Sequence, residues 1–186
     1  MFVTWRLHGT LPRSAQAEGL CHRSGKAFWD RERELDRAVS GPILLRQPAV
    51  AEAVVEMIQA AEIERRICKM HCFVVMPNHV HLLLTPLRPL CEVTKWIKGA
   101  SARRANQILN RTGTPFWQDE SFDHWVRSPA QFSNIERYIA FNPVKAGLVN
   151  EPAAWPYSTA GQHRLKTPWV CSTGLQTRTS ARTAES

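Results

Sequence analysis

Residues 72–86, CFVVMPNHVHLLLTP, contain two apolar runs that meet at the dipeptide Pro77-Asn78. Apolar and β-branched runs on both sides of a two-residue turn are typical of an antiparallel hairpin. The pattern predicts strands over residues 66–76 and 79–86. Since a hairpin needs further strands or helices to cover it, this stretch predicts the centre of a sheet.

Two histidines stand in the second strand, where Val, Leu or Thr would form a better strand. Residues i and i+2 of a strand point to the same face, so His79 and His81 lie side by side, about 7 Å apart at the backbone. Val80 and Leu82 point the other way, into the core. Two neutral imidazoles at this spacing can share one divalent metal ion. From the spacing alone, metal binding and a structural role are equally open.

The ligand set narrows the choice of metal. Zinc needs a third or fourth protein ligand, whereas Mg²⁺ or Mn²⁺ can accept two imidazoles with oxygen ligands, water and phosphate. Such an open site would activate a phosphodiester. Cys68 and Cys72 offer a zinc alternative, but they lack a CxxC spacing and are typical of buried small apolar residues. Leu83 stands where a histidine-triad hydrolase needs its third imidazole, and Leu82-Leu83 excludes the His-x-Thr pattern of two-histidine phosphoesterases.

The remaining patterns predict three helices and two more strands. The strands are expected over 2–8 and 121–127, and the helices over 48–64, 91–110 and 129–141. This order predicts an α+β fold in which helices pack on one face of an antiparallel sheet. We expect one domain over 1–160 with a polar helical insertion at about 12–42, followed by a disordered basic tail over 161–186.

The chain is strongly basic. Its 186 residues carry a formal net charge of +8, with a pI near 9.7, which favours a polyanionic partner. No apolar run approaches the roughly 20 residues of a membrane span, and the start does not have the pattern of a signal peptide. The five cysteines are an odd number without framework spacing. We therefore expect no membrane association and a cytoplasmic, reducing location.

One of the two tyrosines, Tyr138, lies on the third predicted helix. Asn142 follows four residues later and shares its face. Pro143 lacks the amide that would bond to the Ile139 carbonyl, so a kink or a helix junction is expected there, and Gly147 is suited to end the helix. From these residues alone, a core tyrosine near a kink is the simpler interpretation.

Four segments occur in an order that resembles one protein family. They are VVMPNHVHLLLTP, WIKGASARRANQI, FWQDESFDHWVR and YIAFNPVKAGLV. Together they resemble the REP-associated tyrosine transposases, which are relatives of small insertion-sequence transposases with an HUH motif (His, hydrophobic residue, His). The resemblance covers roughly residues 2–160.

The resemblance implies a ferredoxin-like or RRM-like fold and an enzyme that cleaves and rejoins single-stranded DNA beside imperfect hairpins. His79 and His81 match the HUH ligands of Mg²⁺ or Mn²⁺, and Tyr138 matches the nucleophile that forms a 5′-phosphotyrosine. Asn142 matches a position that supplies a further metal ligand from the same helix. The family includes monomers and homodimers, so the oligomeric state stays open.

Basic and aromatic residues near these motifs are candidate DNA contacts. The candidates for the DNA backbone are Arg6, Lys95, Lys98, Arg103, Arg104 and Arg111. Trp96, Trp117 and Trp125 could stack on unpaired bases, although packing in the core is at least as compatible with each. Two other functions stay open: a hairpin-binding module that no longer cuts, and a metal-dependent phosphoesterase that uses water while Tyr138 is structural.

Overall fold

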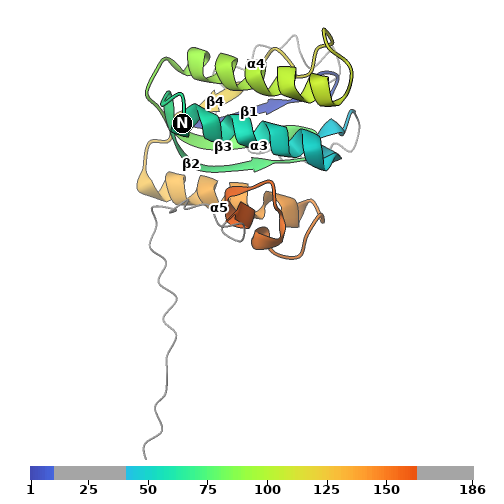
Figure 1. Ribbon diagram of the computed structural model, residues 1–186. Helices are drawn as coiled ribbons and strands as arrows, with labels where there is room; N and C mark the ends of the chain where they lie inside the picture. The colour runs from blue at the N-terminus through green and yellow to red at the C-terminus, as the bar shows by residue number, and fades with distance from the viewer. Residues whose placement is uncertain (11–40, 163–186) are drawn as a thin grey trace, which may run out of the picture.

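The computed structural model describes residues 1–10 and 41–162, so the predicted helical insertion and nearly all of the predicted basic tail lie outside the described residues. The elements follow the predicted order (Figure 1). They are β1 (Phe2–Arg6), α3 (Pro48–Ile63), β2 (Cys68–Val75), β3 (His79–Pro86), α4 (Leu90–Ile108), β4 (Phe122–His124), α5 (Pro129–Lys145) and the short α6 (Thr159–Gln162), with 3-10 turns at Leu44–Arg46 and Pro152–Ala154.

The four strands form one antiparallel sheet in the order β2-β3-β1-β4. The predicted hairpin is confirmed as β2 and β3, and the Met76 amide donates to the His79 carbonyl at 2.8 Å across the turn. Strand β1 pairs with β3 so that Thr4 lies opposite His81 and Arg6 opposite His79. Because opposite residues of an antiparallel pair share a face, these four side chains belong to one face of the sheet.

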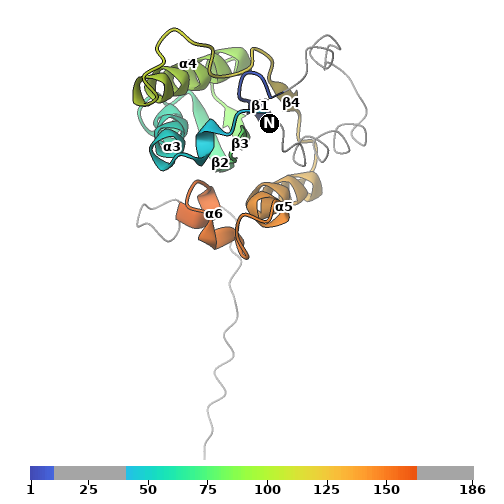
Figure 2. The ribbon, with the colours of Figure 1, turned by 90° about the vertical axis from the view of Figure 1, so that its right-hand side faces the viewer.

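Helices cover both faces of the sheet, as Figure 2 shows with α3 and α4 on one side and α5 and α6 on the other. The first face packs Trp5 and Leu82 against α3 and α4. The second packs Phe2 and Leu83 against Ile135 and other residues of α5. The predicted α+β class and antiparallel sheet are confirmed, but the prediction that helices pack on one face is wrong for α5. The central strand β3 is buried from His79 through Leu84, so both of its faces need a cover.

Helix α5 is longer than predicted because Pro143 does not end it. Proline in the last turn removes a single hydrogen bond, and the helix continues to Lys145. It ends where Gly147 adopts a left-handed φ of 68° and the Leu148 amide donates to the Pro143 carbonyl at 3.0 Å. Tyr138, Asn142 and Lys145 therefore lie on one continuous helix. None of the helices in the described ranges is long and apolar enough to cross a bilayer.

Candidate functional site

The two histidines of β3 lie side by side, as predicted. Their ring centroids are 4.6 Å apart with an interplanar angle of 71°, and both rings are almost completely buried on the face that α5 covers. A strand fixes both backbones, so the pair keeps its spacing without help from a loop. Two imidazoles this close can serve as ligands of a single cation.

Asn78 orients the first of these rings. Its Oδ1 lies 2.6 Å from His79 Nδ1, and because an amide oxygen can only accept, Nδ1 carries the proton. The lone pair of the ring is then on Nε2. Metal-binding histidines commonly have such a partner on the other ring nitrogen, which fixes the tautomer. The sequence pattern indicated only a turn at Asn78, although an amide next to the first histidine was a usable signal.

Tyr138 lies directly beside the histidine pair. Its ring centroid is 5.3 Å from that of His81, and Phe2 packs against both rings, at 6.2 Å from Tyr138 and 5.6 Å from His81. Asn142 is buried one turn later on the same helix. The fold therefore places Tyr138 beside both histidines and buries Asn142 one turn further along the same helix.

The last turn of α5 adds a residue that the sequence reasoning missed. Lys145 Nζ lies 5.2 Å from the centroid of the Tyr138 ring, and the lysine is exposed. A cation at this distance is attracted by the ring quadrupole. The signal in the sequence was the spacing of seven residues, which returns to the same helix face after two turns.

In the part of the chain that the structure describes, the donor set around the two histidines lacks the further protein ligands that a closed zinc site needs. Among the described residues, no group of three or more His, Cys, Asp or Glu side chains converges. If Asn142 joined the two imidazoles as a ligand, coordination positions would remain for water and phosphate oxygens, and such a set would suit Mg²⁺ or Mn²⁺.

The two cysteines considered for zinc lie on opposite faces of the sheet. A register shift in β2 between Met70 and Cys72 places Cys68 in the core under α3 and α4, and Cys72 in the core under α5. Burial and the neighbouring Glu62 carboxyl raise the pKa of the Cys68 thiol to about 11, which keeps it neutral. Their placement favours packing over metal binding.

Three of the six predicted DNA contacts lie on the open surface of α4, and three do not. Lys95, Arg103 and Arg104 are exposed. Arg6 is 4% exposed and belongs to the histidine face, so any contact with a phosphate would be made inside the site. Arg111 is half-buried and donates to the Pro115 carbonyl at 3.1 Å.

Lys98 is turned inward and holds a loop. Its Nζ donates to the carbonyls of Gln118 and Asp119 at 2.7 and 2.8 Å, and to Ser121 Oγ at 3.3 Å. Burial lowers the pKa of Lys98, and the neighbouring Asp119 and Glu120 carboxylates partly oppose this effect. The interpretation of Lys98 as a surface contact for DNA therefore does not fit this conformation, because its donors are used within the chain.

The tryptophans divide between packing and exposure. Trp117 is buried and its Nε1 donates to Ser101 Oγ at 3.0 Å, which fits a role in the core. Trp96 is half-buried, with the Arg65 guanidinium 5.7 Å from its ring. Of these three candidates, Trp125, just after β4, is the one that is largely exposed, at 65%.

The chain is similar in sequence to two curated proteins. The REP-associated tyrosine transposase of Escherichia coli is 28% identical over 92 residues, which cover 49% of this chain and 53% of that relative. A relative from Haemophilus influenzae is 27% identical over 96 residues, covering 46% of this chain and 54% of its own length. The chain thus spans about half the length of these curated relatives.

A solved structure of a REP-associated tyrosine transposase bound to a REP hairpin has the same fold. It aligns with 100% of this chain and 92% of its own, with a TM-score of 0.54 and 17% identity. The family model described as "Transposase IS200 like" matches residues 44–142, which is more than half of the chain and includes the histidine strand, Tyr138 and Asn142. The chain therefore belongs to the IS200-like transposase family.

Proposed function

We propose that this protein is a metal-dependent nickase and strand transferase that acts on single-stranded DNA beside hairpins, through a 5′-phosphotyrosine. The observation that carries the proposal is the packing of the Tyr138 ring 5.3 Å from His81, whose ring lies 4.6 Å from that of His79. Membership in a transposase family supports the reaction class. A relative solved with a REP hairpin supports hairpin DNA as the substrate.

His79, His81 and Asn142 would hold Mg²⁺ or Mn²⁺ in this proposal. A bound divalent cation would supply Lewis-acid activation, because it offsets negative charge on a non-bridging phosphate oxygen. The hydrogen bond from His79 Nδ1 to Asn78 presents Nε2 as the ligand atom of that ring.

Tyr138 would act as the nucleophile. Its hydroxyl oxygen bonds to phosphorus while the bond from phosphorus to the 3′ oxygen breaks, so the DNA leaves with a 3′-hydroxyl and the protein carries the 5′ phosphate. The phenol proton passes to water, and the departing 3′ oxygen takes up a proton. Because the ester retains the energy of the broken bond, a 3′-hydroxyl can attack it and reseal a strand without ATP.

Because the site is buried, DNA cannot reach it in the conformation described. Tyr138 is 9% exposed and the two imidazoles are 2% exposed or less. A phosphodiester can reach them only after neighbouring side chains have moved, such as Phe2, which packs against the rings of both Tyr138 and His81. Exclusion of water from such a site also protects the phosphotyrosine from hydrolysis.

The test uses a labelled single-stranded hairpin oligonucleotide with unpaired flanks and Mg²⁺ or Mn²⁺. We expect a covalent protein–DNA band on a denaturing gel, which Tyr138→Phe abolishes. Tyr157→Phe is the matched control, because Tyr157 is the one other tyrosine of the chain and should leave the band unchanged.

Two other outcomes would favour the alternatives. Binding of many hairpins without cleavage would favour a module that recognises DNA and no longer cuts it. Cleavage that survives Tyr138→Phe would favour a phosphoesterase in which water is the nucleophile.

A further inference from the structure

The start of α5 is tied to β4 by hydrogen bonds that run through Gln131. Ser128 is the N-cap of α5, and its Oγ accepts from the backbone amide of Gln131 at 3.2 Å. The Gln131 side chain turns back, so that its Oε1 accepts from the Arg127 amide at 2.8 Å. This arrangement is close to a capping box, which satisfies backbone donors at a helix start. The remaining group of the side chain, Nε2, contacts His124 Nε2 on the edge strand of the sheet.

These contacts fix the protonation state of His124. Because Gln131 Oε1 accepts from a backbone amide, the NH2 group of the same side chain faces His124, and this group can only donate. His124 Nε2 therefore accepts with its lone pair, and the proton of the neutral ring is on Nδ1. A protonated imidazole has a donor on both nitrogens. Protonation would set one N–H group against another and break the bond to Gln131.

The surroundings of His124 favour the neutral ring. Burial lowers the pKa of His124, and the Arg127 guanidinium and the N-terminal ammonium of Met1 lower it further. The Asp123 carboxylate opposes this effect. From α5 the ring meets the uncharged Gln131 amide. The ring is therefore neutral near pH 7, and it takes up a proton more readily once its contact with α5 is broken.

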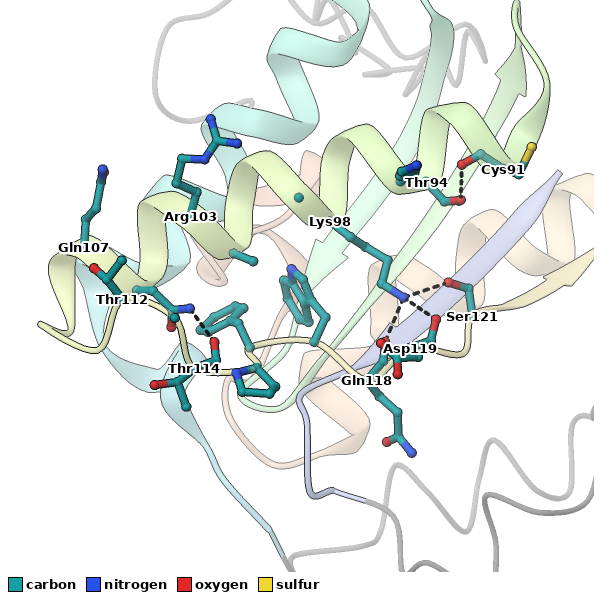
Figure 3. A pocket seen from close by; sticks show the side chains of 18 residues that line it. Cys91, Thr94, Lys98, Arg103, Gln107, Thr112, Thr114, Gln118, Asp119 and Ser121 are labelled. Carbon is teal, nitrogen blue, oxygen red and sulfur yellow. Dashed lines mark hydrogen bonds between the residues drawn. The ribbon is translucent and has the colours of Figure 1, made fainter.

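Strand β4 is a firm support for this contact although it has only three residues. It pairs with β1 so that His124 lies opposite Phe2. Just before it, Lys98 reaches from α4 and donates to the carbonyls of Gln118 and Asp119, as Figure 3 shows. The strand is thus held from two sides, and the helix start is held by the strand.

The contact bears on the proposed nucleophile through the register of α5. Tyr138 is seven residues after Gln131, so the two side chains share a helix face and are about 10 Å apart along the axis. Phe2, opposite His124 on the same face of the sheet, packs against the Tyr138 ring. A shift of the first turn of α5 would move Tyr138 relative to His81, because the hydrogen-bonded turns between them move together.

A second histidine touches α5 from the other edge strand, β2, in a different way. The His71 ring packs edge-on against Phe132 at 5.1 Å, and its Nε2 lies 2.8 Å from Thr85 Oγ1. A hydroxyl can donate or accept, so it remains a partner of a charged ring. Burial lowers the pKa of His71, as do Lys69 and the N-terminal ammonium, while Glu136 opposes them. Protonation of His71 therefore leaves its contacts intact.

We propose that His124 positions Tyr138 by holding the start of α5 through Gln131, and that protonation of its ring releases this hold. The inference rests on the proposed function for the role of Tyr138, whereas release of the helix start requires no reaction. Because the released ring binds a proton more tightly, the hold is complete above the ordinary histidine pKa of about 6.5 and weakens as the pH falls below it.

The first experiment measures hydrogen exchange of the amides of residues 129–134 by mass spectrometry, in the full chain without DNA or added metal. Rates are compared at pH 7.5 and 5.5 after correction for the intrinsic effect of pH. One unit below the ordinary pKa, the released state gains up to about tenfold, so protection of the helix start should fall by a similar factor.

Three variants identify the group responsible. His124→Gln keeps an acceptor near the position of Nε2 and does not titrate, so it should stay protected at both pH values. His124→Leu should lose protection at both. His8→Gln replaces an exposed histidine and should behave like the unchanged protein. His79 and His81 are present in every variant, so their own protonation cancels in the comparison. An equal loss at pH 5.5 in His124→Gln and the unchanged protein would overturn the inference.

The second experiment follows single-turnover formation of the covalent adduct with a flanked hairpin and Mn²⁺. We expect His124→Leu to slow it by about tenfold at pH 7.5, since a small misplacement of a reacting group is costly, and His124→Gln to restore most of the rate. A normal rate for His124→Leu would refute the positioning role alone. If the unchanged protein forms no adduct, the nickase is refuted, and the exchange data then decide whether His124 holds the helix.

Discussion

The Lys145 ammonium and the Tyr138 ring are stacked on one face of α5, with 5.2 Å between Nζ and the ring centroid. Seven residues separate them, so the contact depends on the helix continuing through Pro143 for two full turns. A positive charge beside the phenol stabilises negative charge on its oxygen and on a phosphate that approaches it. The geometry gives Lys145 a positioning and electrostatic role in the proposed reaction.

Lys145→Met should slow formation of the phosphotyrosine by about tenfold at neutral pH, because one charge is lost near the developing anion. The rate should recover at higher pH, where hydroxide removes the phenol proton more readily. The pH–rate profile of Lys145→Met should therefore be shifted toward higher pH. Lys145→Arg should retain most of the rate, since a guanidinium also packs on an aromatic face. Single-turnover cleavage over a range of pH measures both effects.

Arg137→Met provides the control for a general loss of charge from the same helix. Arg137 is exposed and its Nη2 donates to Asn134 Oδ1 at 3.2 Å, away from the ring contact made by Lys145. If Arg137→Met and Lys145→Met shift the profile equally, the specific role of Lys145 is refuted.

Asn78→Ala should weaken the metal site without removing a ligand. The substitution deletes the acceptor of the His79 Nδ1 proton, so the ring loses both its tautomer and its orientation. Loss of such a partner typically costs about 10- to 100-fold in metal affinity. Mn²⁺ titration followed by electron paramagnetic resonance measures affinity directly. Asn78→Asp, which keeps an acceptor oxygen, should bind Mn²⁺ more tightly than Asn78→Ala, and the reverse order would contradict the assigned role.

Local pattern was sufficient to predict the hairpin and the histidine pair. Side-chain alternation and a two-residue turn are properties of neighbouring residues, so the placement of His79 beside His81 follows from the sequence. The contact between Tyr138 and His81 does not, because nothing in α5 states which face of the sheet it will cover. Only the resemblance to a family indicated that these residues meet.

The positions of basic residues in the sequence did not predict which of them are exposed on the folded protein. Lys98 and Arg103 look alike in the sequence, since both are basic residues of the predicted helix over 91–110. The fold turns Lys98 toward two carbonyls and leaves Arg103 exposed. The carbonyls come from a loop about twenty residues later, and loop conformation is not encoded in a helical period.

Lys98→Met should destabilise the fold by about 2 kcal/mol, since three hydrogen bonds to an ammonium are lost and the carbonyls of Gln118 and Asp119 lose a donor. Lys95→Met, on the exposed side of the same helix, should change the free energy of unfolding by less than about 0.5 kcal/mol. Urea denaturation of both variants gives the comparison. Equal stability of the two would show that the loop does not depend on Lys98.

The thiols provide a test of the zinc alternative. The pKa of Cys68 is raised to about 11 by burial and by Glu62, so at pH 8 its thiol is protonated and nearly unreactive. Cys72 is buried on the opposite face of the sheet, whereas Cys91 is exposed. Iodoacetamide should therefore label Cys91 in the folded protein and label Cys68 and Cys72 only after denaturation, as read from their peptides. The protein should also release no stoichiometric zinc on denaturation. If zinc is released and chelation alone makes Cys68 and Cys72 reactive, the two thiols hold a metal, and their assignment to separate cores is wrong.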